Sequence, residues 1–99
     1  MGFVQTIDVE TQDRGALAQH LAAWHGDQHG LAPGYQGYRL LADRDRPGQF
    51  RIVVDFNSAA DAKTNDGRPE TAAWAAKLSE LTTATPSFGN FDCVAESGS

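Results

Sequence analysis

Apolar and polar positions alternate over most of residues 3–10, with Phe3, Ile7 and Val9 on one side of an extended chain. A period of two in a segment rich in β-branched and aromatic residues predicts a strand. The same period recurs in Gln49 to Phe56, and two more segments have the composition of strands. The predicted strands cover residues 3–10, 38–43, 49–56 and 87–95.

Helical spacing replaces this alternation after Asp13, where Leu17, Leu21 and Trp24 recur three and four residues apart. Asp is a favourable N-cap residue, and the spacing places the three apolar side chains on one face. Two glycines, Gly26 and Gly30, are expected to end this helix. The residues that follow, 31–37, are rich in turn formers and predict a loop.

A second helical region divides into two helices. Ser58 is expected to cap a short helix over residues 59–65, which Gly67 breaks. Pro69 suits the first turn of the next helix, because its missing N–H is not needed there. This helix carries Trp74, Leu78 and Leu81 on one stripe.

The order of elements predicts an α+β fold of the ferredoxin-like βαββαβ type, a single domain over residues 1–99 with a four-stranded antiparallel sheet. Residues 95–99 are small and polar and are expected to fray. Both long helices cover one face of the sheet. The other face, expected to carry Val4, Leu41, Val53 and Phe88, predicts a homodimer in which two sheets close into an α/β barrel.

Composition narrows the function classes. The 99-residue chain has a net charge of −5, which disfavours nucleic acid and anionic membranes as partners. No apolar run approaches the roughly 20 residues of a membrane span, and the first residues lack the features of a signal peptide. A cytoplasmic protein is expected. Cys93 is the only cysteine, so an internal disulfide is impossible.

Parity along the strands predicts where polar side chains gather. If Ile7, Ile52 and Phe91 face the helices, a second set faces the open side of the sheet. That set is Thr6, Asp8, Arg51, Asp55, Asn90 and Asp92. Three carboxylates and an arginine inside a partly closed barrel predict a polar pocket. The alternative is that these side chains are solvated at strand ends or form ion pairs across a dimer interface.

Other candidate groups have ordinary structural explanations. Two tyrosines, Tyr35 and Tyr38, flank a glycine-rich loop, where each phenol either donates to a ligand or packs on the loop. Trp24 and Trp74 fit the role of core anchors. The three histidines, His20, His25 and His29, lack further ligands at a fixed spacing, so no metal site is predicted.

Three segments resemble the antibiotic biosynthesis monooxygenase family of dimeric α/β-barrel proteins over roughly residues 4–94. Residues 33–41, PGYQGYRLL, resemble the Pro-Gly segment that leads into the family's second strand. Residues 51–58, RIVVDFNS, resemble its third strand and helix cap. Residues 68–74, RPETAAW, fall on its Ser-Pro-His-Phe segment with the following Trp.

The resemblance implies a cofactor-independent monooxygenase that acts on an aromatic or polyketide-like molecule. Two family histidines are replaced here by Asn65 and Glu70. Because a carboxylate is a poor substitute for an imidazole ligand of haem iron, haem degradation is not expected. Oxygenation through the substrate's own carbanion is compatible with these changes, and no cofactor is predicted.

Three functions stay open at this point. As an oxygenase, the chain is expected to use Asp55, Asn90 and Asn65 as catalytic groups. The expected substrate contacts are Trp74, Tyr38, Tyr35, Arg51 and Thr6. A non-catalytic small-molecule binder and a purely structural dimer are the alternatives, and they are distinguished by whether the barrel encloses a cavity or fills itself.

Overall fold

A computed structural model describes residues 2–97; Met1 and the last two predicted tail residues, 98 and 99, lie outside the described residues. Seven elements follow one another in the order βαββααβ. They are β1 (Phe3–Glu10), α1 (Arg14–Gln28), β2 (Tyr35–Ala42), β3 (Gln49–Phe56), α2 (Ala59–Asp66), α3 (Pro69–Leu81) and β4 (Ser87–Asp92).

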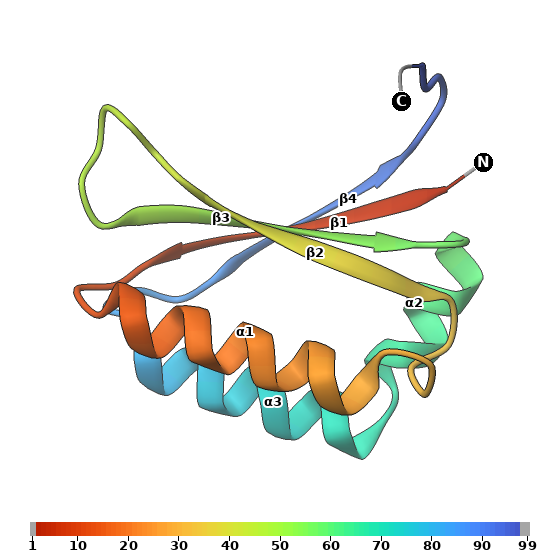
Figure 1. Ribbon diagram of the computed structural model, residues 1–99, viewed down its shortest axis with the longest axis horizontal. Helices are drawn as coiled ribbons and strands as arrows, with labels where there is room; N and C mark the ends of the chain where they lie inside the picture. The colour runs from red at the N-terminus through yellow and green to blue at the C-terminus, as the bar shows by residue number, and fades with distance from the viewer. Residues whose placement is uncertain (1, 98–99) are drawn as a thin grey trace.

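The four strands form one antiparallel sheet in the order β2-β3-β1-β4. Figure 1 shows α1 and α3 side by side beneath this sheet and α2 at one end; none of the helices within residues 2–97 lies on the opposite face. The predicted ferredoxin-like α+β fold is therefore confirmed. The connection from β3 to β4 contains two helices, α2 and α3. No helix within residues 2–97 is both long and apolar enough to span a membrane.

The core lies between the helices and the central strands. Its fully buried side chains come from β1, α1, β3 and α3, namely Ile7, Leu17, Leu21, Ile52 and Leu78. The alternation of β1 and the helical spacing of α1 thus converge on one apolar layer, as their sequence periods predict. Burial of each such side chain stabilises the fold by roughly 1.5–3 kcal/mol relative to exposure.

Both predicted helix caps are present. The Asp13 carboxylate accepts a hydrogen bond from the Ala16 amide at 2.9 Å, and the Ser58 hydroxyl accepts one from the Asp61 amide at 3.1 Å. Each satisfies an amide that has no partner inside its helix.

Several helices and strands begin or end at other residues than the sequence predicts. Helix α1 continues through Gly26 to Gln28, because a single glycine costs a helix only about 1 kcal/mol, and tertiary packing outweighs that cost. Strand β2 begins at Tyr35 instead of 38, with an irregular register at Tyr35/Gly37. Strand β4 ends at Asp92. The predicted loop over 31–37 is therefore shorter than expected.

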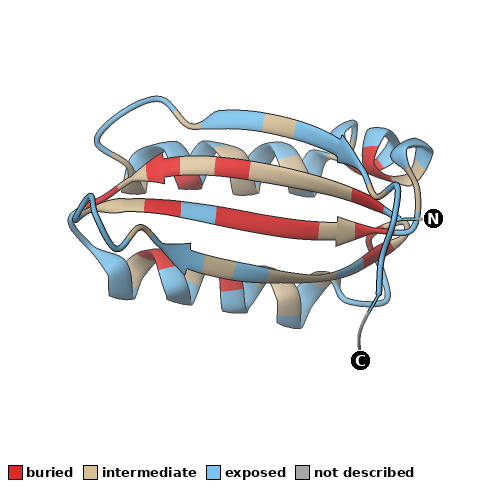
Figure 2. Cartoon of the chain, turned by 90° about the horizontal axis from the view of Figure 1, so that it is seen from above, coloured by how far each residue is buried: buried red, intermediate tan, exposed pale blue. Residues whose placement is uncertain are grey.

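Figure 2 looks onto the uncovered face, where buried positions concentrate on the two central strands and the edge strands are mostly exposed. Val4, Leu41 and Val53 lie on this face as predicted, since Val4 pairs with Asp55 and Leu41 with Arg51.

The prediction for β4 is wrong, because its two faces are exchanged. Phe88 pairs with the buried Ile7, so it lies on the helix side, while Phe91 pairs with Val4 on the open face. Gly89 confirms this orientation, since a Cβ added there would meet the Thr6 hydroxyl at 2.6 Å.

Candidate functional site

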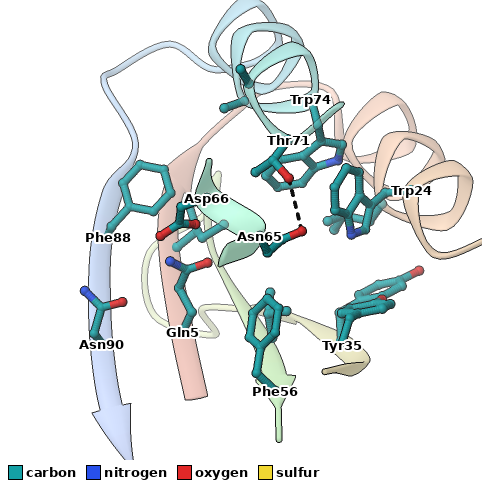
Figure 3. A pocket seen from close by; sticks show the side chains of 16 residues that line it. Gln5, Trp24, Tyr35, Phe56, Asn65, Asp66, Thr71, Trp74, Phe88 and Asn90 are labelled. Atoms are coloured by element: carbon teal, nitrogen blue, oxygen red, sulfur yellow. Dashed lines mark hydrogen bonds between the residues drawn. The ribbon is translucent and has the colours of Figure 1, made fainter. Parts of the chain in front are cut away.

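A cavity of about 360 Å³ lies between the helices and the covered face of the sheet. That volume is within the range of small-molecule sites. Most of its lining is apolar or aromatic, and Figure 3 shows the side chains that surround it. The lining residues are Gln5, Ile7, Leu21, Trp24, Tyr35, Tyr38, Val54, Phe56, Asn65, Asp66, Thr71, Ala72, Trp74, Ala75, Phe88 and Asn90.

Two tryptophans form one wall of the cavity. The Trp24 ring of α1 and the Trp74 ring of α3 lie 5.5 Å apart, tilted by 50°. The His20 ring stacks on Trp74 at 5.1 Å with an interplanar angle of 10°. These contacts fix the orientation of the Trp74 ring, and the two indoles give this wall of the cavity an aromatic surface.

The Nε1 atom of Trp74 is buried and has no hydrogen-bond partner within residues 2–97. A buried donor without a partner costs roughly 1–3 kcal/mol. This cost is part of the packing of Trp74 between the two helices.

The side chain of Asn65 is held in one orientation by its neighbours. Asn65 is only 4% exposed, and its Oδ1 accepts hydrogen bonds from the Thr71 hydroxyl at 3.1 Å and from the Arg68 guanidinium at 3.3 Å. A guanidinium can only donate, so the oxygen of the amide is identified without ambiguity. Figure 3 shows the bond to Thr71.

The amide nitrogen of Asn65 is consequently the end left for a ligand. No acceptor within residues 2–97 takes a hydrogen bond from its Nδ2. Arg68 itself is anchored by Gln28 of α1 and by Glu70, each at 2.8 Å. The cavity thus has a pre-oriented N–H donor, the kind of group that stabilises negative charge developing on oxygen.

A carboxylate lies at another part of the cavity. Asp66, the last residue of α2, points toward the side chain of Gln5 on β1, with Phe88 and Asn90 of β4 nearby (Figure 3). Asp66 as a residue is exposed, yet burial of its carboxyl raises its pKa above the ordinary value, and a hydrogen bond from Gln5 only partly offsets the effect.

Tyr35 occupies the opposite side, near the end of α1. Its hydroxyl lies 2.8 Å from Nδ1 of His25, whose ring stacks on His29 at 4.9 Å. The pKa of Tyr35 is raised to about 12. Burial of the phenol is the largest cause, and the electrostatic effects of Tyr38 and Asp55 add to it. The phenol is therefore neutral at physiological pH and keeps its hydrogen-bonding proton. The side chain of His25 therefore contacts a tyrosine that lines the cavity.

The structure divides the residues predicted from sequence into two groups. Five of them line the cavity: Tyr35, Tyr38, Asn65, Trp74 and Asn90. The other three, Thr6, Arg51 and Asp55, lie on the uncovered face of the sheet, since Thr6 pairs with Val53 and Asp55 with Val4.

The expected polar pocket on the uncovered face is therefore not built as predicted. Arg51 forms an ion pair with Asp8 across β1 and β3, with a 2.7 Å distance between Nε and Oδ1. Asn90 pairs with Gln5 and so faces the helices instead. The cause is the exchanged parity of β4, which carries a phenylalanine on each of its faces.

Sequence reasoning missed Asp66 and Gln5. Asp66 follows the predicted short helix, where an acidic residue has no distinguishing pattern. Its position at the C-terminal end of a helix is unfavourable for a carboxylate, and this local conflict is the signal that was available. Gln5 shares the parity of Ile7 in β1, but a single amide among apolar residues is no signal of a site.

Within residues 2–97, no cluster of three or more His, Cys, Asp or Glu side chains is arranged to hold a metal ion. The stacked pair His25 and His29 has no third ligand of this kind.

No protein-family model matches the chain, and no curated protein matches it. Solved structures match it over nearly its whole length, with low sequence identity. Rv0793 from Mycobacterium tuberculosis has a TM-score of 0.77 at 18% identity, covering 99% of this chain and 100% of that one. A candidate antibiotic biosynthesis monooxygenase from Caulobacter crescentus has a TM-score of 0.77 at 16% identity, covering 95% and 91%.

SnoaB, a cofactor-independent oxygenase from Streptomyces nogalater, has a TM-score of 0.75 at 16% identity, covering 96% of this chain and 95% of that one. Identities this low establish the fold and leave the activity to be argued from the site. The resemblance predicted from three short segments is confirmed at that level: over its full length, this chain has the fold of the antibiotic biosynthesis monooxygenase proteins.

Proposed function

We propose that this protein is a cofactor-independent monooxygenase that acts on a small aromatic or polyketide-like molecule bound between the helices and the sheet. The observation that carries the proposal is the aromatic-lined cavity with the oriented amide of Asn65 in its wall. The same fold in SnoaB, described as a cofactor-independent oxygenase, supports this choice of reaction.

The proposed reaction uses the substrate as its own reductant. A base removes a proton from a C–H bond that a neighbouring carbonyl and aromatic ring make acidic. The carbanion transfers its electron pair to molecular oxygen, forming a C–O bond and a peroxide anion. Return of a proton gives the hydroperoxide, and loss of water leaves a carbonyl. One CH₂ group and one O₂ thus yield one C=O group and one water.

Asn65 is proposed to stabilise the negative charge that develops on oxygen. Its Nδ2 donor is held in place before the reaction, so little reorganisation is needed when charge appears. Trp74 is proposed to supply an aromatic surface for the substrate. Tyr35 and Tyr38 are proposed to contact the substrate from β2, and Asn90 from β4.

The substitution Asn65→Asp tests this role. An aspartate keeps the oxygen that accepts from Thr71 and Arg68 but loses the N–H donors. With anthrone, an aromatic ketone with an acidic CH₂ group, as the probe, kcat/KM for oxygen uptake is expected to fall about 100-fold or more. The measurement is oxygen consumption with product identified by mass spectrometry.

Asn57→Asp is the matched control. Asn57 is exposed and lies outside the cavity, and its Oδ1 also accepts a side-chain hydrogen bond, from Gln36. This variant is expected to retain the wild-type rate. Equal rates for Asn65→Asp and wild type would remove Asn65 from the mechanism. Oxygen uptake no faster than without protein would contradict the oxygenase function.

A non-catalytic binder is the second candidate. Glu70, which replaces a family histidine, lies outside the cavity and pairs with Arg68, so this position contributes no imidazole to the site. Retention of anthrone in the cavity without oxygen uptake, measured by quenching of tryptophan fluorescence, would favour this function over the first.

The uncovered face of the sheet is proposed to bind a second copy of the chain. Val4, Val53 and the exposed side chains of Leu41 and Phe91 share this face. Burial of such a surface against its copy is favourable because it removes apolar area from water. The charged and polar residues Thr6, Arg51 and Asp55 then belong to the dimer interface and not to the substrate site.

A further inference from the structure

We propose that Asp66 is the catalytic base of this site and accepts the substrate proton with its carboxylate, which lies beside Gln5. This inference rests on the proposed function, because it assigns the proton transfer of that reaction. It replaces Asp55, which lies on the opposite face of the sheet.

The charge distribution in the cavity singles out Asp66. Among the residues that line the cavity, Asp66 is the only one with a formal charge, since neither Lys, Arg nor His is among them. A carboxylate without a cationic partner is available to accept a proton. Every other polar group in the lining is an amide, a hydroxyl or an indole, and these are weaker bases at neutral pH.

The geometry places this carboxylate within the cavity. It is carried by the last residue of α2, directly after Asn65. Figure 3 shows Asp66 beside Gln5, with the Phe88 ring above the same region and Asn65 farther along the wall. An aromatic ligand that contacts Asn65 through its oxygen therefore has Asp66 toward its other side. Donor and base are held by consecutive residues of one helix.

The environment strengthens the base. Loss of water around the carboxyl raises the pKa of Asp66, which increases its affinity for a proton. The helix C-terminus adds partial negative charge, which acts in the same direction. The other titratable groups in the lining are Tyr35 and Tyr38 of β2, and the elements β1, β3, β4, α1 and α3 present only uncharged residues to the cavity.

The step balances as a simple transfer. The C–H bond of the substrate breaks, its electron pair stays on carbon, and the proton binds a carboxylate oxygen of Asp66. The carboxylic acid then returns this proton to the peroxide anion formed with O₂, and the carboxylate is restored.

This step is tested by the rate at which the CH₂ protons of anthrone exchange with deuterium in D₂O, measured by NMR. Under nitrogen no O₂ is present, so the assay reports proton transfer alone. Wild type is expected to accelerate exchange, and Asp66→Asn to lose about 100-fold or more of that acceleration. Asp66→Asn is expected to unfold at the same urea concentration as wild type or at a slightly higher one, because a carboxylate is unfavourable at a helix C-terminus.

Asp92→Asn is the control, since Asp92 also lies on the covered side of β4 but does not line the cavity; its exchange rate should equal that of wild type. Equal exchange in wild type and Asp66→Asn overturns the proposal, as does a wild type that accelerates no exchange. If exchange is fast and depends on Asp66 but no oxygen is consumed in air, the base assignment stands and the oxygenase function fails.

Discussion

At the scale of single residues, two neighbours in α2 face different surroundings. Asn65 is buried and held by Thr71 and Arg68, while Asp66 extends toward Gln5 across the cavity. Both would be unremarkable polar residues in an exposed helix. Their chemistry comes from the groups around them, which orient an amide in one case and desolvate a carboxyl in the other.

Burial of the Tyr35 phenol predicts how the stability of the protein depends on pH. Because burial raises the pKa of Tyr35 from 10.0 to about 12, the unfolded chain releases this proton first as the pH rises. Stability conferred by the neutral phenol is thus complete below pH 10 and is lost between pH 10 and 12. The loss amounts to about 2 kcal/mol at the upper end.

The substitution Tyr35→Phe checks this linkage by urea unfolding at a series of pH values. At neutral pH the variant is expected to be less stable by about 1 kcal/mol, since the hydrogen bond with His25 is lost. Between pH 10 and 12 its stability should decline less steeply than that of wild type. Parallel decline of the two proteins would show that Tyr35 ionises normally.

At the scale of elements, the segment between α1 and β2 is pressed against α2. Gly34 has a φ of +64°, a region that other residues rarely adopt. A Cβ at this position would overlap the Asp61 side chain in the first turn of α2. The Gly34 carbonyl also accepts a hydrogen bond from the Asn57 amide at 2.8 Å, which fixes the start of β2 beside the end of β3.

Gly34→Ala is therefore expected to lower the free energy of unfolding by about 2 kcal/mol, measured by urea denaturation. Gly26→Ala is the matched control. Gly26 lies inside α1, and an added Cβ there meets nothing within 4 Å. Because alanine favours a helix by up to about 1 kcal/mol over glycine, the control should gain stability. If both substitutions changed the free energy of unfolding equally, the backbone at Gly34 would not require glycine more than that at Gly26.

At the scale of the whole molecule, the two faces of the sheet have separate tasks. The covered face forms the core and the cavity. The uncovered face carries apolar side chains, and no helix within residues 2–97 lies over it (Figure 1). This division implies that the proposed dimer and the proposed substrate contacts depend on different residues. A change on the uncovered face should alter assembly more than chemistry.

Leu41→Asp tests the assembly. Leu41 is 44% exposed on the uncovered face, and a buried unpaired charge there opposes pairing of two sheets. Sedimentation equilibrium is expected to show a dimer for wild type and mainly monomer for this variant. Leu31→Asp is the control, since Leu31 lies outside the sheet and is 70% exposed; it should stay dimeric. A monomeric wild type at high concentration would exclude the dimer.

The sequence by itself determined the elements and most of the core, because the period of two in β1 and β3 and the helical spacing in α1 and α3 state which residues share a face. It also brought Asn65 and Trp74 to notice through a family resemblance, and the two tyrosines through their position beside a glycine-rich loop. Only the tertiary structure decided which face of β4 meets the helices, since Phe88 and Phe91 make both faces apolar.

That one register with β1 moved Asn90 into the cavity and separated it from Asp55. The position of α2 at one end of the sheet brought Asp66 to Gln5, two residues 61 positions apart in the chain. Alternation along a strand fixes relative orientation, but hydrogen-bond pairing with a neighbouring strand fixes the absolute one. For this reason the fold could be predicted from the chain, and the location of the site could not.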